Sequence, residues 1–246
     1  PAASGLLRAM QSLAVRDTAA LLADVQRQWG GQSDLWVFGY ASLIWRPEFQ
    51  PADEHPAVVH GWHRALRMRS RVNRGTPEQP GLVYALVSGG MCRGMVYRIP
   101  RERGRDELDR LWLREMPTGV YDPRLLPCQT PQGPVLALAF TLSRRSEACL
   151  PRLSDAEMLH ILRHARGRYG STLDYLVQTA LELRARGIRD REIERLLALA
   201  RRLAPLGWHL QIHGDTRRLT EVAPARVDHA LSQALAQPLA EPGAVG

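Results

Sequence analysis

The strongest local pattern in the sequence is the segment Val37-Phe38-Gly39-Tyr40-Ala41-Ser42-Leu43-Ile44-Trp45. Its apolar first half, which begins at Leu35, is typical of a buried strand. The small residues that follow predict a turn where a ligand can approach backbone N–H groups closely, and such groups bind a carboxylate or an oxyanion. A strand end with a serine-capped turn explains the same pattern without a ligand, and on pattern alone that is the commoner case.

Further strands are predicted on the C-terminal side of this stretch. They cover residues 58–72 (broken at Gly61), 82–87, 91–99, 124–130 and 134–142. The segments 82–87 and 91–99 are expected to form a hairpin across Ser88-Gly89-Gly90. About six strands would then occupy residues 35–142, mostly joined by short turns.

Helices are predicted on both sides of the strand region, over residues 18–29, 106–116, 155–166, 172–186 and 190–203. This order predicts an α+β fold, in which an antiparallel or mixed sheet, with a barrel as one form, is packed by helices and followed by a helical C-terminal third. We expect a helical extension over 1–34, one domain over 35–204 and a partly irregular extension over 205–246.

The charge of the chain comes from an unusual composition. Its 33 basic residues are all arginine, and with 25 acidic residues they make a formal net charge of +8 over 246 residues. The lack of lysine excludes a Schiff-base lysine, a lysine general base and a phosphate-loop lysine. The positive charge leaves both nucleic acid and an anionic small molecule open as partners.

Several patterns bear on the compartment. The sequence has no apolar run of about 18 residues, so neither a membrane span nor a membrane partner is expected. We see no signal-peptide pattern near the start. Cys92, Cys128 and Cys149 are too few and too unevenly spaced for a disulfide framework or a zinc site. These patterns predict a cytoplasmic protein.

Glu115 is a candidate acid or base because it ends the predicted helix 106–116. The negative end of the helix dipole disfavours an ionised carboxylate there, which would raise its pKa as general acid–base chemistry needs. The alternative is a surface ion pair with Arg114 or another nearby arginine, and on sequence alone that interpretation is favoured.

Two other clusters have weaker functional signals. One is an acid-free run of arginines: Arg64, Arg67, Arg69, Arg71 and Arg74. The run could bind phosphates or a carboxylate, but a solvated sheet face is the commoner explanation. The other is the pair His160 and His164, whose spacing suits a metal but which lacks further convincing ligands, so no metal site is predicted.

Four segments, in order, resemble the ChaC-like γ-glutamylcyclotransferases, which act on glutathione. They are residues 37–49, where Tyr40-Ala41-Ser42-Leu43 matches the family's Tyr-Gly-Ser-Leu loop; Arg74-Gly75-Thr76-Pro77-Glu78 with Pro80-Gly81; Arg114-Glu115 followed by Gly119 and Tyr121; and Tyr169-Gly170-Ser171-Thr172-Leu173-Asp174-Tyr175-Leu176. One motif alone would be weak, whereas four in order are specific. The chain departs from the family at Ala41 and at Val120, where the family has glycine.

The resemblance implies a compact mixed β-barrel surrounded by helices, with no metal and no cofactor. It implies that Glu115 is the catalytic acid/base. It also implies that Phe38, Gly39, Tyr40, Ala41, Ser42 and Leu43 form the substrate cradle, with Tyr121 and Tyr175 as further pocket residues.

The expected reaction is cleavage of glutathione to 5-oxoproline and Cys-Gly by attack of the substrate's own α-amine, with Glu115 moving the proton. A cyclotransferase for other γ-glutamyl amino acids or amines is the alternative within the same chemistry. An arginine-rich nucleic-acid-binding protein is the alternative of another class, although no nucleic acid is expected as a partner. The oligomeric state is left open.

Overall fold

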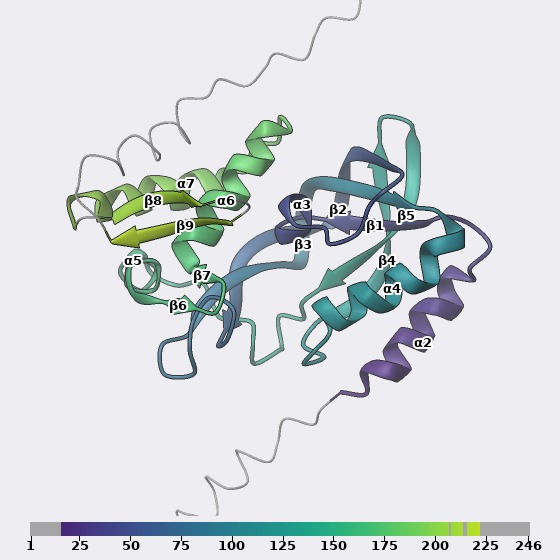
Figure 1. Ribbon diagram of the computed structural model, residues 1–246, viewed down its shortest axis with the longest axis horizontal. Helices are drawn as coiled ribbons and strands as arrows, with labels where there is room; N and C mark the ends of the chain where they lie inside the picture. The colour runs from purple at the N-terminus through teal and green to yellow at the C-terminus, as the bar shows by residue number, and fades with distance from the viewer. Residues whose placement is uncertain (1–15, 207, 214–215, 222–246) are drawn as a thin grey trace, which may run out of the picture.

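A closed barrel of five strands forms the centre of the fold in this computed structural model, which describes residues 16–206, 208–213 and 216–221 (Figure 1). The strands are β1 (Leu35–Gly39), β2 (Asp53–Ser70), β3 (Gly81–Ile99), β4 (Asp122–Thr130) and β5 (Gly133–Thr141). They lie in the order β1-β3-β2-β4-β5, with antiparallel ladders between neighbours. Parallel pairing of β1 with β5 closes the barrel, so the expected mixed barrel is confirmed.

The predicted hairpin across Ser88-Gly89-Gly90 is wrong, which is why the barrel has five strands rather than six. β3 runs through these residues and stays paired with β2, which is almost equally long. Gly61, Gly89 and Gly90 all have positive φ (79°, 98° and 72°), and the register shifts between His60 and Trp62. The glycines therefore form a β-bulge inside two continuous strands rather than a turn between two short ones.

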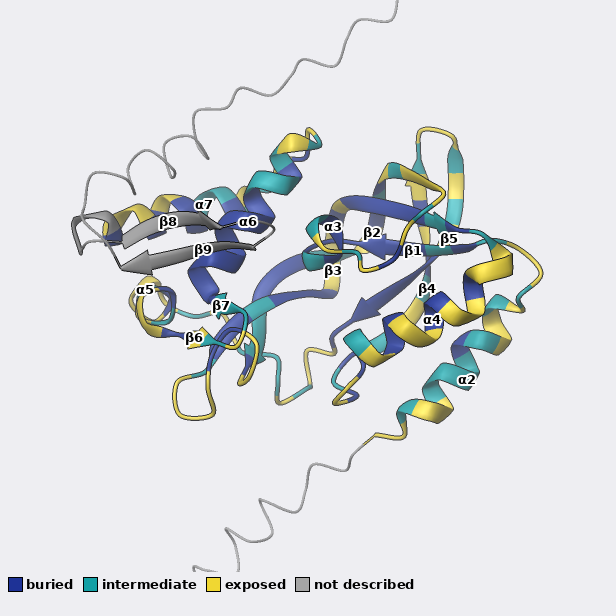
Figure 2. Ribbon diagram, viewed as in Figure 1, coloured by how far each residue is buried: buried dark blue, intermediate teal, exposed yellow. Residues whose placement is uncertain are grey.

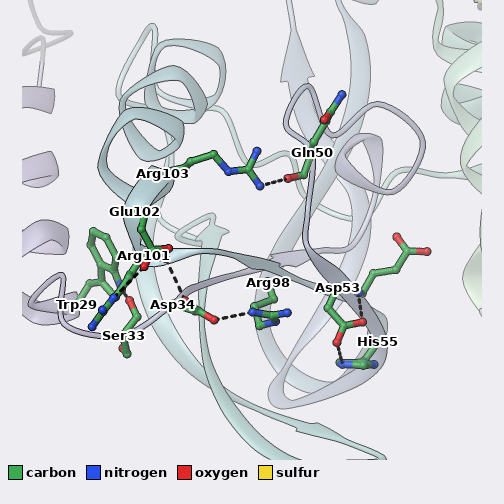
Figure 3. Close-up of polar contacts among 11 residues, drawn as sticks. Trp29, Ser33, Asp34, Gln50, Asp53, His55, Arg98, Arg101, Glu102 and Arg103 are labelled. Atoms are coloured by element: carbon green, nitrogen blue, oxygen red, sulfur yellow. Dashed lines mark hydrogen bonds and ion pairs between the residues drawn. The ribbon is translucent and has the colours of Figure 1, made fainter.

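Helix α4 (Arg101–Glu115) begins five residues before the predicted position, because a distant side chain caps it. Pro100 at the N-cap position makes no side-chain cap. Instead, Asp34 Oδ1 accepts from the Arg101 backbone N–H at 3.0 Å, while its Oδ2 binds Arg98 Nη1 at 2.7 Å (Figure 3). The helix that carries Glu115 at its last residue is thus anchored to the start of β1.

Helix α2 (Thr18–Trp29) lies beside α4 on one side of the barrel (Figure 1). The Asp17 side chain caps its start as the sequence predicts. The indole N–H of Trp112 in α4 donates to the Thr18 carbonyl at 2.9 Å. The Trp29 ring covers Gly104, where a Cβ atom would come within 2.5 Å of that ring.

The remaining helices pack on the other side of the barrel. They are α3 (Ser42–Trp45), α5 (Asp155–His164), α6 (Thr172–Ala185) and α7 (Arg191–Ala200). The last three confirm the predicted helices within a few residues. α6 is buried along most of its length (Figure 2), and Trp45 Nε1 donates to its Thr179 hydroxyl at 3.3 Å.

The C-terminal third is less purely helical than predicted. It also contains the strands β6 (Arg166–Gly167), β7 (Gly170–Ser171), β8 (Trp208–His213) and β9 (Thr216–Glu221), and a 3₁₀ helix, η1 (Arg201–Leu206). β8 and β9 pair antiparallel. The extensions predicted over 1–34 and 205–246 lie partly outside the described residues.

Candidate active site

Glu115 lies at the C-terminal end of α4 with its side chain only 14% exposed. Burial raises its pKa above the ordinary value, and the adjacent Arg114 guanidinium partly opposes that rise. The predicted direction of the pKa shift is therefore confirmed, but burial rather than the helix dipole is the largest cause. The ion pair with Arg114, which was the alternative interpretation of Glu115, is present as well, because Arg114 Nε lies 2.9 Å from Glu115 Oε1.

Three buried tyrosines lie near enough to this carboxylate for its charge to affect them: Tyr40 after β1, Tyr121 before β4 and Tyr175 in α6. Burial raises the pKa of each of them, and the negative charge of Glu115 contributes to all three shifts. The pKa of Tyr175 reaches about 12, so its hydroxyl stays neutral near pH 7. The three rings thus supply neutral hydroxyl groups and no competing charge.

The turn at Tyr40, Ala41 and Ser42 presents backbone donors. Arg64 Nε donates to the Tyr40 carbonyl. Because a trans peptide points its C=O and N–H in opposite directions, the Ala41 N–H points away from Arg64. Within the described part of the chain, neither the Ala41 nor the Ser42 amide donates to a protein acceptor. Two free amides at the start of α3 can therefore hold an oxyanion or a carboxylate.

Phe38, Gly39 and Leu43, the other three residues of the predicted cradle, are apolar or glycine and, like Tyr40 and Ala41, they are packed into the protein interior. Phe38 is fully buried and Leu43 is 5% exposed. A Cβ atom at Gly39 would come within 2.9 Å of the Tyr97 ring, so only glycine fits. The structure thus divides the predicted cradle into a polar turn at Tyr40–Ser42 and a supporting layer beneath it.

Neither departure from the family pattern lies in the left-handed conformation that favours glycine. Ala41 has φ −150° and ψ −113°. Gly119 takes the left-handed conformation at φ 63°. Among the described residues other than glycine, Glu48 alone has positive φ, so Val120 does not.

The outer side of the site carries a chain of charges that sequence reasoning did not find. Glu48 Oε1 lies 2.6 Å from Arg46 Nε, and its Oε2 lies 3.6 Å from Arg114 Nη1. Arg114 also donates to the Arg46 carbonyl and, at 3.5 Å, to the Ser42 hydroxyl. Glu48 has φ 60°, a left-handed conformation that costs a non-glycine residue about 1–2 kcal/mol. No local sequence pattern indicates this arrangement.

The arginine run is not one solvated face. Arg64 and Arg74 are only 4% and 6% exposed. Arg74 lies 5.1 Å from the centre of the Tyr175 ring, and so packs behind the site. Arg71 is exposed, and the other two arginines are half-buried. The interpretation of the arginine run as a solvated sheet face therefore holds only in part. Because two of the arginines are buried, the run offers less continuous positive surface to a polyanion.

The rings of His160 and His164 on α5 have their centres 4.8 Å apart and are tilted by 47° to each other. In the described ranges, no three His, Cys, Asp or Glu side chains gather in a way that could hold a metal ion. Among the same residues, no helix has the length and apolarity needed to cross a membrane.

Comparison with known proteins points to one family. The model of that family, described as ChaC-like protein, matches residues 35–203. The chain is 33% identical over 173 residues to the glutathione-specific gamma-glutamylcyclotransferase of Escherichia coli (strain K12), covering 70% of this chain and 75% of that protein. It is 32% identical over 164 residues to glutathione-specific gamma-glutamylcyclotransferase 1 of Homo sapiens, covering 64% and 73%.

A solved structure agrees in fold. The crystal structure of the gamma-glutamylcyclotransferase specific to glutathione from yeast superposes with a TM-score of 0.63 at 22% sequence identity, covering 70% of this chain and 97% of that one. At this identity the likeness shows the fold, a five-stranded mixed barrel with surrounding helices.

Proposed function

The chain belongs to the ChaC-like protein family, and from that premise we propose that it is a glutathione-specific γ-glutamylcyclotransferase. One observation in the structure supports this proposal above the others. Glu115 is a largely buried carboxylate with a raised pKa, near three neutral tyrosines and linked through Arg114 to the turn with two free amides. A proton acceptor beside an oxyanion site is what the cyclisation of a γ-glutamyl amide requires.

The reaction begins with the substrate's α-ammonium group. Glu115 takes a proton from it, and a raised pKa makes this carboxylate a better base than an exposed glutamate. The free amine then attacks the γ-carbonyl carbon of the same molecule and closes a five-membered ring. Because the attack is intramolecular, the protein has only to fold the substrate and stabilise charge.

The γ-carbonyl oxygen becomes an oxyanion when the ring closes. In our proposal the N–H groups of Ala41 and Ser42 bind it, since their amides have no other acceptor among the described residues. Loss of one such donor typically lowers kcat about 10²–10³-fold. Arg64 keeps the Tyr40–Ala41 peptide in the orientation that this role needs.

The C–N bond to the cysteine residue breaks in the last step. Glu115 returns its proton to the leaving nitrogen, so that one carboxylate acts first as base and then as acid, and the ring nitrogen loses its second proton, which the released Cys-Gly amine takes up as an ammonium group. The products are 5-oxoproline and Cys-Gly, and no water is consumed. Because burial keeps the three tyrosine hydroxyls neutral, our proposal assigns the proton transfer to Glu115 among the described residues of the inner site.

The test is a product assay on purified protein. Incubation with glutathione should release 5-oxoproline and Cys-Gly in equal amounts, and Glu115→Gln should lower kcat about 10²–10⁴-fold. Glu102→Gln is the matched control, because Glu102 lies on the same helix and also binds the arginine that precedes it. Full activity of Glu115→Gln would contradict the mechanism. Turnover of other γ-glutamyl amides but not of glutathione would change the substrate and keep the chemistry.

A further inference from the structure

We propose that Glu48 is a positioning residue for Glu115: its carboxylate binds Arg46 and Arg114 on the outer side of the site, so that Arg114 is shared between two carboxylates. The inference rests on the proposed function, because it concerns how well Glu115 takes a proton from the substrate. It adds a residue that lies outside the cradle and that binds both a near neighbour in the sequence, Arg46, and a distant arginine, Arg114.

The geometry of the charges carries the proposal. Arg114 lies between two acids, with Nε 2.9 Å from Glu115 and Nη1 3.6 Å from Glu48. Glu48 binds Arg46 more closely, at 2.6 Å. Two carboxylates thus face two guanidinium groups in the order Glu115, Arg114, Glu48, Arg46. Each arginine has a carboxylate partner, so Glu115 does not hold Arg114 alone.

The backbone at Glu48 shows that this placement is specific. Glu48 adopts φ 60°, which glycine takes freely and other residues seldom do. Its flanks are held: the Arg46 carbonyl accepts from Arg114, and the Phe49 ring packs against Tyr97 with centroids 5.6 Å apart. Strained residues persist where the surrounding structure holds them, and they occur often at functional sites. A glycine would be the low-strain choice here, yet the chain has a glutamate.

The electrostatic effect of Glu48 follows from the groups around Glu115. Arg114, on the same helix, lowers the pKa of Glu115, while Glu48, from the segment after α3, raises it. Tyr40, Tyr121 and Tyr175 are neutral, so they do not offset Arg114.

Arg46 and Arg114 are the charged groups that bind Glu48. Without the Glu48 carboxylate, Arg114 would pair with Glu115 alone. Glu115 would then be a weaker base toward the α-ammonium group.

The first variant is Glu48→Gln, which keeps the side-chain length and the strained backbone but removes the charge. We expect the acid limb of the pH profile of kcat/KM to move to lower pH by about half a unit, and kcat on the plateau to fall about threefold. Titration of the Glu115 carboxylate by NMR should show the same downward shift. This second readout does not depend on which substrate is turned over.

The second variant is Glu48→Gly, which removes the charge and relieves the backbone strain together. We expect its acid limb to match that of Glu48→Gln, while its melting temperature rises by about 2–4 °C above the natural protein. A stability gain combined with weaker catalysis is not what loss of a structural ion pair would produce. The Glu102→Gln control should change neither quantity.

The outcomes separate the two proposals. An unmoved acid limb and an unmoved Glu115 titration in both variants would overturn the role of Glu48, even if the enzyme is active. Absence of 5-oxoproline with the natural protein would overturn the proposed function instead. Even without 5-oxoproline, a downward shift of the Glu115 titration in the Glu48→Gln variant would show that Glu48 controls the proton affinity of Glu115.

Discussion

The guanidinium group of Arg64 lies 2.5 Å from Oδ2 of Asp190, and this ion pair joins the barrel to the C-terminal helices. The Arg64 side chain is 1% exposed, and it also donates to the carbonyls of Tyr40 and Arg93. Asp190 in turn caps the start of α7 by accepting from two backbone N–H groups. One buried cation therefore links the turn at the active site to the helical layer behind it.

Substitution of Arg64 should destabilise the protein strongly. Arg64→Ala leaves Asp190 and two carbonyls without their buried donor, so the free energy of unfolding should fall by about 3–5 kcal/mol. Urea denaturation measures the loss. The control is Arg71→Ala, which removes an exposed arginine of the same run and should cost less than about 0.5 kcal/mol. If Arg64→Ala and Arg71→Ala lower the free energy of unfolding by the same small amount, the buried Arg64–Asp190 pair does not stabilise the fold.

Arg114→Gln should move the pH dependence in the opposite direction from Glu48→Gln. It removes the cation that lowers the pKa of Glu115, so that pKa rises further and the acid limb of kcat/KM moves to higher pH. A pH–rate profile on glutathione measures the limb. The rate on the plateau can also fall, since Arg114 donates to the Ser42 hydroxyl. The position of the limb is the diagnostic quantity, and a shift to lower pH would contradict the charge arrangement.

Asp174 should make the protein less stable as the pH rises. Burial raises the pKa of this carboxyl from 3.8 to about 6 in the folded state. Between these two values the folded state binds more protons than the unfolded state, so unfolding becomes easier with rising pH, by on the order of 2–3 kcal/mol in total. Asp174→Asn should remove this dependence, because an asparagine side chain does not titrate. Its side-chain oxygen can still accept from the Ser171 N–H, so the hydrogen bond is kept.

Urea denaturation at pH 4 and pH 7 measures the Asp174 effect. Asp155→Asn, at an exposed carboxylate in the first turn of α5, is the control and should leave the difference between the two pH values almost unchanged. A natural protein and an Asp174→Asn variant with the same pH dependence would contradict the raised pKa.

Gly94→Ala should disturb the layer beneath the active-site turn. A Cβ atom at Gly94 would come within 2.3 Å of the Gly39 carbonyl and 2.8 Å of the Phe38 ring. Overpacking of this kind costs about 1–3 kcal/mol, and displacement of Gly39 would move the adjacent turn. We expect a lower melting temperature together with a lower kcat, measured on the same preparation. An unchanged kcat would show that the turn is positioned independently of β3.

Local patterns predicted those parts of the fold that local physics controls. The Asp17 cap starts α2, and the capping box at Ser154 starts α5, as predicted. The start of α4 was missed because its cap, Asp34, is 67 residues away from Arg101 in the sequence. The Ser88-Gly89-Gly90 bulge was taken for a turn because a glycine pair permits both conformations and only pairing with β2 selects one.

The sequence by itself determined the identity of most helices and strands and the four ordered motifs, whose resemblance to a known family implied the acid/base role of Glu115. These depend on side-chain periodicity, caps and short spacings, which lie within a few residues of one another. The closure of the barrel and the surroundings of Glu115 were decided by the tertiary structure alone. Tyr40, Glu48 and Tyr175 come from three separate segments, and burial and Coulomb interactions depend on distances in space that no local pattern contains.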